Sequence, residues 1–454
     1  MLFFFSSTLC SLVLDRRYKE LGREEAAAML RRALGRAVTQ ISACSCSVTK
    51  PMLLRFCGTS GLGSSQEESV ARQMIQYALS HARSQKSGES YAQAMLVLEQ
   101  GLSNFQASGG DSDDDAIGVL LLAMSTLLYE RGELGDTIEK LQMVLRLEGA
   151  SLPVRVAALE GLVGLRLENG EDNASRMQAD DYLQLLKGST DTQASFALDA
   201  VTSRAKAIKG LADLATGELN TAELLFSDEN TNLEEDKIQK GNAVLSYGEY
   251  LHATGNFSLA KDLYERIIEV FEAKDGFDYA YPAAANMVPE EVLLGATCAL
   301  GQLLSQSGKF NDSEELLTKA LNMAENHFGS THPKVGVVLT CIALLFKHKA
   351  RIESSSSILI QEGLYRRALD LLKAPGCDFE VKNNHVDRRD VVALARGGYA
   401  EILLIQQNRK AEGERMSKWA EATWRNHRLS LAQALEFSEP SQAAVIDTRI
   451  SRVL

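Results

Sequence analysis

Residues 241–272 read GNAVLSYGEYLHATGNFSLAKDLYERIIEVFE and contain a phrase that recurs along the chain. The phrase is a glycine, a bulky apolar residue two positions later and a small residue three positions after that. Five copies are present, and they begin at Gly132, Gly217, Gly255, Gly308 and Gly363. A turn repeated in this way predicts a fold that is built from repeated structural units.

A second small residue stands twelve positions before the one that ends the phrase, in four of the five copies. Small residues on both sides of a glycine turn let two antiparallel helices cross closely, because no large side chain separates their backbones. Larger apolar residues recur around them at helical spacing, as with Val244, Leu251 and Tyr264. Each unit is therefore predicted to be a helical hairpin. The four small pairs are Ser125/Thr137, Gly210/Ala222, Gly248/Ala260 and Gly301/Ser313.

This pattern resembles the tetratricopeptide repeat, whose two helices carry small residues at the eighth and twentieth positions. Residues 241–272 and 294–325 fit best, within a resemblance that covers residues 115–375. His332-Pro333 and the residues after it are similar to the repeat variant of kinesin light chains, in which His-Pro opens the first helix. Where that variant usually has two asparagines lining a peptide groove, this chain has Thr340 and Cys341.

The resemblance implies an α-solenoid, a right-handed superhelix of about eight antiparallel helix hairpins. We expect it to cover residues 67–427, followed by a C-terminal tail at residues 428–454. A stack of such hairpins exposes a concave face that suits a protein or peptide partner.

The composition agrees with an all-α chain that buries a core. Of the residues, 45% are hydrophobic and 24% are charged, and only seven of 454 are prolines, which favours long helices. The repeat region has no apolar pattern with the period of two that strands show. No internal apolar run reaches the roughly 18 residues that would span a membrane, so no membrane span is predicted.

The charge is divided unevenly between the N-terminus and the rest of the chain. Residues 1–58 hold nine basic and four acidic residues, so residues 59–454 hold 39 against 56, a balance of −17. Nucleic-acid binding depends mainly on clustered Lys and Arg that neutralise phosphates. This acidic body therefore predicts no nucleic-acid partner.

The N-terminus has the composition of a transit peptide. From residue 26 to residue 66 there is no acidic residue, and Arg31, Arg32 and Arg36 are interspersed with small and apolar residues. We predict that residues 29–58 direct the chain to mitochondria, most simply to the matrix, and that residues 1–28 are an upstream extension of the gene model. The alternatives are a secretory signal near the start, a chloroplast protein or a cytoplasmic one.

Sequence motifs of catalysis and cofactor binding are missing. There is no phosphate-binding glycine loop, dinucleotide-binding fingerprint, His-Glu-x-x-His zinc motif or nucleophile elbow. His327 and His332 have no third metal ligand nearby in sequence, and Cys298 and Cys341 are expected to be buried apolar residues. We therefore predict no catalytic residue, no cofactor, no metal site and no enzymatic activity.

The expected concave face is defined by the fifth and ninth positions of successive first helices. Related repeat domains place Lys or Asn there to hold a partner's carboxylates, and this chain has no such set. The face is mostly apolar with a negative spot, which suits an amphipathic helix or the chain's own C-terminal segment. The predicted partner-binding residues are Glu249, Gln302 and Thr340. We expect lysine at Glu249 or Gln302 to leave folding nearly intact, within ~0.5 kcal/mol.

Together these features predict a non-catalytic protein-binding adaptor or assembly scaffold of mitochondria. Two alternatives stay open: a structural subunit of a larger organellar complex, its groove permanently filled, or a cytosolic adaptor like the kinesin light chains.

Overall fold

The computed structural model of the chain divides into two compact units, Met1–Gly63 and Ser64–Leu454. The structure describes residues of the second unit only: 66–108, 114–188, 195–227, 241–273, 282–354, 357–377, 386–436 and 443–454. The predicted upstream extension and transit peptide, residues 1–28 and 29–58, lie outside the described residues.

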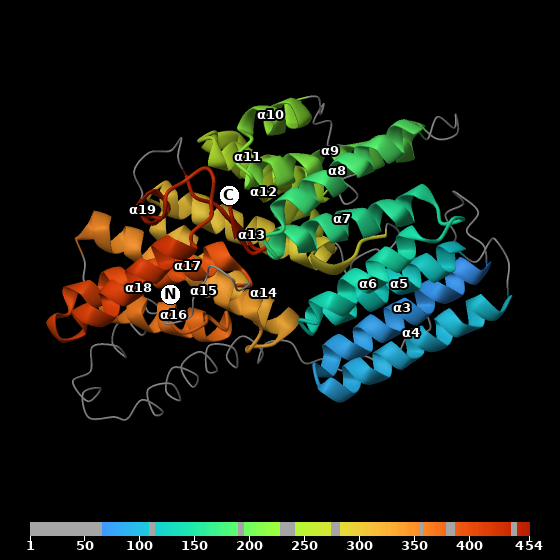
Figure 1. The fold of residues 1–454 in the computed structure, drawn as a ribbon, viewed down its shortest axis with the longest axis horizontal. Helices are drawn as coiled ribbons and strands as arrows, with labels where there is room; N and C mark the ends of the chain where they lie inside the picture. Colours follow the sequence, from blue (N-terminus) through green and yellow to red (C-terminus); the bar gives the residue numbers. More distant parts are fainter. Residues whose placement is uncertain are drawn as a thin grey trace. The chain divides into compact units, whose positions relative to one another are not determined.

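The described residues are almost entirely helical (Figure 1), which confirms the predicted all-α class. Two short 3₁₀ helices, η3 (Ala285–Met287) and η5 (Gln407–Arg409), and two short strands, β1 (Ile446–Asp447) and β2 (Arg452–Val453), accompany the α-helices. The α-helices in chain order are α3 (Gln66–Gln85), α4 (Gly88–Ser108), α5 (Asp114–Glu130), α6 (Leu134–Leu145), α7 (Leu152–Glu168), α8 (Asp172–Gly188), α9 (Ser195–Ala215), α10 (Leu219–Ser227), α11 (Gly241–Ala253), α12 (Phe257–Glu272), α13 (Pro289–Gln306), α14 (Phe310–Phe328), α15 (Pro333–Glu353), α16 (Ile358–Leu371), α17 (Arg389–Ile405), α18 (Lys410–Thr423) and α19 (Leu431–Leu435).

Consecutive helices pack against each other in pairs. Helix α5 packs on α6, α11 on α12, α13 on α14 and α15 on α16, and each pair also contacts the next along the chain. The first helices of neighbouring pairs are also in contact: α11 contacts α13, and α13 contacts α15. Helices that contact mainly their sequence neighbours are the arrangement expected of a repeat-like chain.

Four copies of the repeated phrase form turns within helix pairs, as predicted: α5–α6, α9–α10, α11–α12 and α13–α14. Their glycines have the positive φ angles that favour glycine: 78° at Gly132, 83° at Gly217, 84° at Gly255 and 74° at Gly308. The fifth copy differs, because Gly363 lies inside α16 instead of in a turn. Helix α15 ends at Glu353 and α16 begins at Ile358, so the copy at Gly363 comes after the start of the second helix.

The small residues lie at close helix crossings. A Cβ atom added to Gly248 would lie 2.7 Å from Tyr264 Cε1, and one added to Gly301 would lie 2.7 Å from Leu317 Cγ. At the second crossing, the Ser313 hydroxyl also donates a hydrogen bond of 2.7 Å to the Gly301 carbonyl. The predicted reason for small residues at these positions is thereby confirmed.

Gly248→Leu is therefore expected to destabilise the chain by about 1–3 kcal/mol, because the added side chain must displace the buried Tyr264 ring. Thermal unfolding followed by circular dichroism measures the effect. Gly135→Leu is the control, since a Cβ at Gly135 meets no atom within 4 Å. An unchanged melting temperature for Gly248→Leu would contradict the close crossing.

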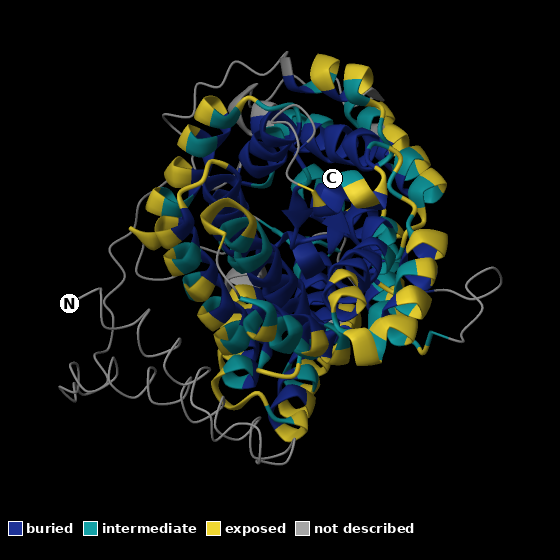
Figure 2. Cartoon of the chain, turned by 90° about the vertical axis from the view of Figure 1, so that its left-hand side faces the viewer, coloured by how far each residue is buried: buried dark blue, intermediate teal, exposed yellow. Residues whose placement is uncertain are grey.

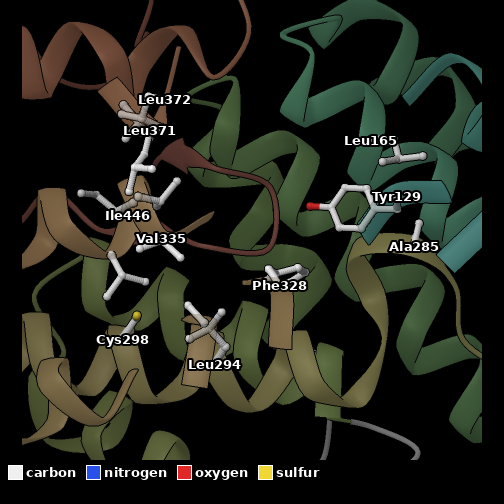
Figure 3. Close-up of a cluster of buried hydrophobic side chains, with 14 of the residues drawn as sticks. Tyr129, Leu165, Ala285, Leu294, Cys298, Phe328, Val335, Leu371, Leu372 and Ile446 are labelled. Atoms are coloured by element: carbon white, nitrogen blue, oxygen red, sulfur yellow. The ribbon is translucent and has the colours of Figure 1, made fainter. Parts of the chain in front are cut away.

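Buried residues lie on the inward sides of the helices, and exposed residues lie on their outward sides (Figure 2). Cys298 and Cys341 are free thiols inside this core, as predicted. Figure 3 shows Cys298 beside Val335 and Ile446, so a residue near the end of the sequence belongs to the same core. Among the described helices, none combines the length and apolar character needed to cross a membrane.

Candidate partner-binding face

Residues 443–454, here called the buried segment, lie inside the described unit instead of forming a separate tail. All of them except Ala444 are buried. Strands β1 and β2 pair antiparallel, with Ile446 opposite Val453, so the segment is a short hairpin. Helix α19, which also belongs to the predicted tail, packs on α17. We predicted a boundary at residue 428 between a repeat domain and a tail. The structure instead places the residues on both sides of it in one compact unit.

Apolar side chains of the buried segment enter two different core clusters. Ile446 and Val453 belong to the cluster that includes much of α5, α15 and α17. Val445, Ile450 and Leu454 belong to a second cluster, which includes much of α9, α11 and α12. The segment therefore contributes side chains to both clusters.

The carboxamide of Gln302, on α13, pairs with the backbone of the buried segment. Gln302 Nε2 donates to the Ile446 carbonyl at 3.0 Å, and the Ile446 amide donates to Gln302 Oε1 at 2.8 Å. One turn further on, Gln306 Nε2 donates to the Ala444 carbonyl at 2.8 Å. This bidentate pairing imitates a strand neighbour and satisfies buried backbone groups whatever the side chain at 446 is.

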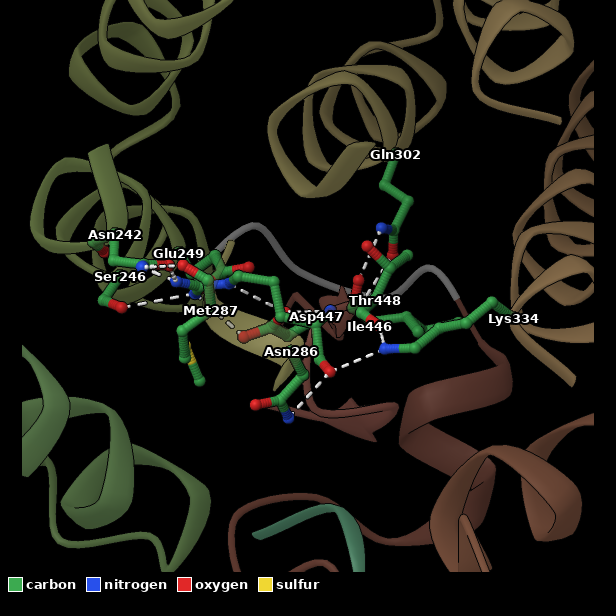
Figure 4. A network of polar contacts seen from close by, with 11 residues as sticks. Asn242, Ser246, Glu249, Asn286, Met287, Gln302, Lys334, Ile446, Asp447 and Thr448 are labelled. Carbon is green, nitrogen blue, oxygen red and sulfur yellow. Dashed lines mark hydrogen bonds and ion pairs between the residues drawn. The ribbon is translucent and has the colours of Figure 1, made fainter. Parts of the chain in front are cut away.

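Arg449 of the buried segment bonds to four polar side chains, those of Asn242, Ser246, Glu249 and Asp447, which Figure 4 labels. Its guanidinium donates to Glu249 Oε2 at 2.5 Å and to Asp447 Oδ2 at 2.9 Å, and it also reaches Ser246 and Asn242 on α11. The Arg449 and Glu249 side chains are fully buried. Burial raises the pKa of Glu249 well above its usual value, and the neighbouring Asp447 carboxylate adds to that rise, while Arg449 opposes it.

Lys334, the second residue of α15, is also fully buried and holds the turn of the hairpin. Its ammonium donates to the Thr448 carbonyl at 2.5 Å and to the Arg449 carbonyl at 2.6 Å. The Arg449 carbonyl accepts a further bond of 3.1 Å from Asn286 Nδ2. The Lys334 ammonium lies 3.5 Å from Glu291 Oε1, so its charge has a nearby carboxyl partner.

Arg452 forms a second charged anchor on the other side of the hairpin. It donates to Asp390 Oδ2 at 2.7 Å and to Asp172 Oδ1 at 2.8 Å, and also to the Leu167 carbonyl at 3.0 Å. Asp390 is at the start of α17 and Asp172 at the start of α8. The two arginines therefore tie the segment to helices far apart in the sequence.

Two of the three predicted partner-binding residues meet at this segment. Glu249 and Gln302 bind it directly, so the structure realises the second of the two predicted occupants of the face, the chain's own C-terminal residues. Thr340 does not join them: it is buried and its hydroxyl donates to the Gly336 carbonyl of its own helix at 2.9 Å.

The repeat pattern does not indicate Lys334, Asn286 or the two arginines, Arg449 and Arg452. The one available signal for Lys334 was its place directly after His332-Pro333, at the helix start. We call the residues whose side chains bond to the segment from α11, η3, α13 and α15 the inner face; they are Asn242, Ser246, Glu249, Asn286, Gln302, Gln306 and Lys334.

Glu291 provides a pH-dependent prediction at this site. Neither of its oxygens has a hydrogen-bond partner among the described residues, and burial raises its pKa from 4.5 to about 8. The folded chain therefore holds a proton that the unfolded chain releases, and the free energy of unfolding should fall as the pH rises toward 8. The slope is at most about 1.4 kcal/mol per pH unit for one such group.

Glu291→Gln should flatten this slope between pH 6.5 and pH 8, measured by urea unfolding. Three histidines add a slope of the opposite sign, because burial lowers the pKa of His252 to about 4, that of His332 to about 3 and that of His348 to about 4. In the unfolded chain they titrate at about pH 6.5, so this slope extends into the window, but it is the same with and without the substitution and cancels in the difference between the two chains. The slope of Glu291→Gln is therefore expected to lie above that of the parent chain, and identical slopes would contradict the assignment to Glu291.

No cluster of histidine, cysteine or carboxylate side chains that could hold a metal ion is found among the described residues. The polar side chains of the inner face are instead directed at carbonyls, amides and arginines of a polypeptide. Comparison with protein-family models finds no match, and comparison with curated proteins finds none either.

Proposed function

We propose that this chain is a non-catalytic protein-binding adaptor or assembly scaffold of mitochondria, built as an α-solenoid of tetratricopeptide-like hairpins. The observation that carries the proposal is the inner face, where Gln302 and Lys334 bind the backbone of the chain's own residues 443–454. Side chains that bind backbone groups and a few side chains of a polypeptide are typical of a peptide-binding surface and not of a reaction centre.

The repeated hairpins supply the geometry for this role. Adjacent pairs place their first helices in contact, so residues at matching positions, such as Glu249 on α11 and Gln302 on α13, face one bound chain. A solenoid scaffold with an extended face of this kind suits protein recognition.

Affinity purification from isolated mitochondria tests the proposal. A tagged chain is expected to retain one or more specific proteins, which are absent when the tag alone is used. A matched variant, Arg366→Ala, changes an exposed residue of α16 and should retain the same set. Retention of no protein above the tag control would overturn the proposal.

A second candidate, the structural subunit of a larger complex, is favoured by the full burial of Arg449 and Lys334. A face filled this completely would contribute stability, and partners would then bind elsewhere on the chain. Hydrogen exchange distinguishes the two: in a structural subunit, the amides of Ile446 and Leu454 stay protected in the assembled complex. In an adaptor that uses the inner face, partner binding increases their exchange.

The mitochondrial location is tested with residues 29–58 fused to a fluorescent protein. The fusion is expected in mitochondria, and replacing Arg31, Arg32 and Arg36 with glutamate should abolish import, because a basic helix is the feature that is recognised. A diffuse signal would favour the cytosolic adaptor instead, and entry into the secretory pathway with residues 1–28 included would favour a signal peptide.

A further inference from the structure

We propose that the inner face is a receptor for a short hairpin-forming segment with an aspartate followed by arginines two and five residues later, and that the buried segment is its built-in occupant. The inference rests on the proposed protein-binding function and names the class of partner. It is drawn from the way in which residues 443–454 are held.

The occupant is held in its hairpin shape by hydrogen bonds between its own residues. The Val445 and Leu454 amides and carbonyls bond to each other, at 3.2 Å and 2.7 Å, and close the hairpin. Asp447 Oδ1 accepts from the Arg449 amide at 2.8 Å, which fixes the turn. Because the backbone groups at the two ends of the hairpin bond to each other, fewer of them need partners on the surface that binds the segment.

Recognition of the occupant divides into backbone and side-chain parts. Gln302 and Lys334 bind backbone groups at residues 446, 448 and 449, which any sequence would offer. Selectivity comes from buried carboxylates: Glu249 receives Arg449, and Asp390 receives Arg452. A segment without these cations would leave buried negative charges without partners, which is costly.

The segment's attachment to the chain makes it a strong competitor. A short tether gives an effective concentration in the millimolar range, so a free segment of the same sequence should bind poorly while the chain is intact. Once the tether is cut, the built-in occupant and an added segment compete as equals. Cutting the tether therefore makes binding of an added segment measurable without changing any contact of the inner face.

The experiment uses the full chain with residues 437–442, which lie outside the described residues, replaced by the recognition sequence of a site-specific protease. After cleavage, a fluorescein-labelled peptide of residues 443–454 is titrated and its anisotropy measured. We expect saturable binding to the cleaved chain and none to the uncleaved one. The peptide with Arg449→Ala should bind at least about ten-fold more weakly.

Two matched variants control the result. The Thr448→Val peptide should bind within about two-fold of the parent, because the Thr448 hydroxyl has no hydrogen-bond partner among the described residues. In the cleaved chain, Gln302→Leu should weaken binding of the parent peptide, since the pairing with residue 446 is lost.

The inference is overturned if the cleaved chain loses its helical circular dichroism, because the segment would then be an inseparable part of the fold. It is equally overturned if the Arg449→Ala peptide binds as well as the parent. Such a failure differs from failure of the proposed function, since the affinity purification could still retain partners that bind another surface.

Discussion

Glu249→Lys is expected to destabilise the chain by at least about 3–5 kcal/mol, the cost of breaking a buried ion pair. The variant places a second cation beside the Arg449 guanidinium, where Glu249 Oε2 now lies at 2.5 Å, with both side chains fully buried. Desolvation and like-charge repulsion act together there, because no water can screen either charge. Urea unfolding followed by circular dichroism gives the change in midpoint and free energy.

A carboxylate on the surface supplies the control for this substitution. Glu223→Lys makes the same charge change at an exposed position of α10, where surface changes are usually within ~0.5 kcal/mol. Equal midpoints for the two variants would show that Glu249 is not in the buried network. The expected result reverses the expectation from the sequence alone, which placed Glu249 on an open face.

The hairpins were predictable because their signal is local and repeated. Each glycine turn and each pair of small residues lies within one unit, so the period alone predicts which helices cross. The pattern does not identify a turn where one of its residues is replaced by a residue that makes a different contact. A fifth glycine turn, at Gly170 with a φ of 73°, does not fit the repeated phrase, because Asp172 stands where the phrase has a bulky apolar residue. That aspartate binds Arg452.

The inner face was predictable only in part. Helical position placed Glu249 and Gln302 on the face that receives a partner or the C-terminal residues, and both do contact the buried segment. Position could not distinguish Thr340, whose hydroxyl bonds to its own helix. The segment itself carries no repeat signal, and its burial depends on charges that residues 172, 249 and 390 supply from distant helices.

Those distant contacts change how the array should unfold. In a simple repeat protein each unit touches only its neighbours, so units can unfold separately. Here the buried segment bonds to α8 through Asp172, to α11 through Glu249 and to α17 through Asp390. Its apolar residues also enter both core clusters. We therefore expect the described helices to unfold together while the segment is in place.

Arg449→Ala is expected to destabilise the chain by about 3–5 kcal/mol, because it leaves Glu249 and Asp447 buried without their cation. It should also broaden urea unfolding or divide it into two transitions, as the helices lose a shared contact. Arg366→Ala, at an exposed position, should change neither quantity. In a Glu249→Ala background the same substitution should cost less, and this difference measures the coupling between the two residues. Additive costs, with a single sharp transition in every variant, would mean that the buried segment does not hold the helices together through this pair.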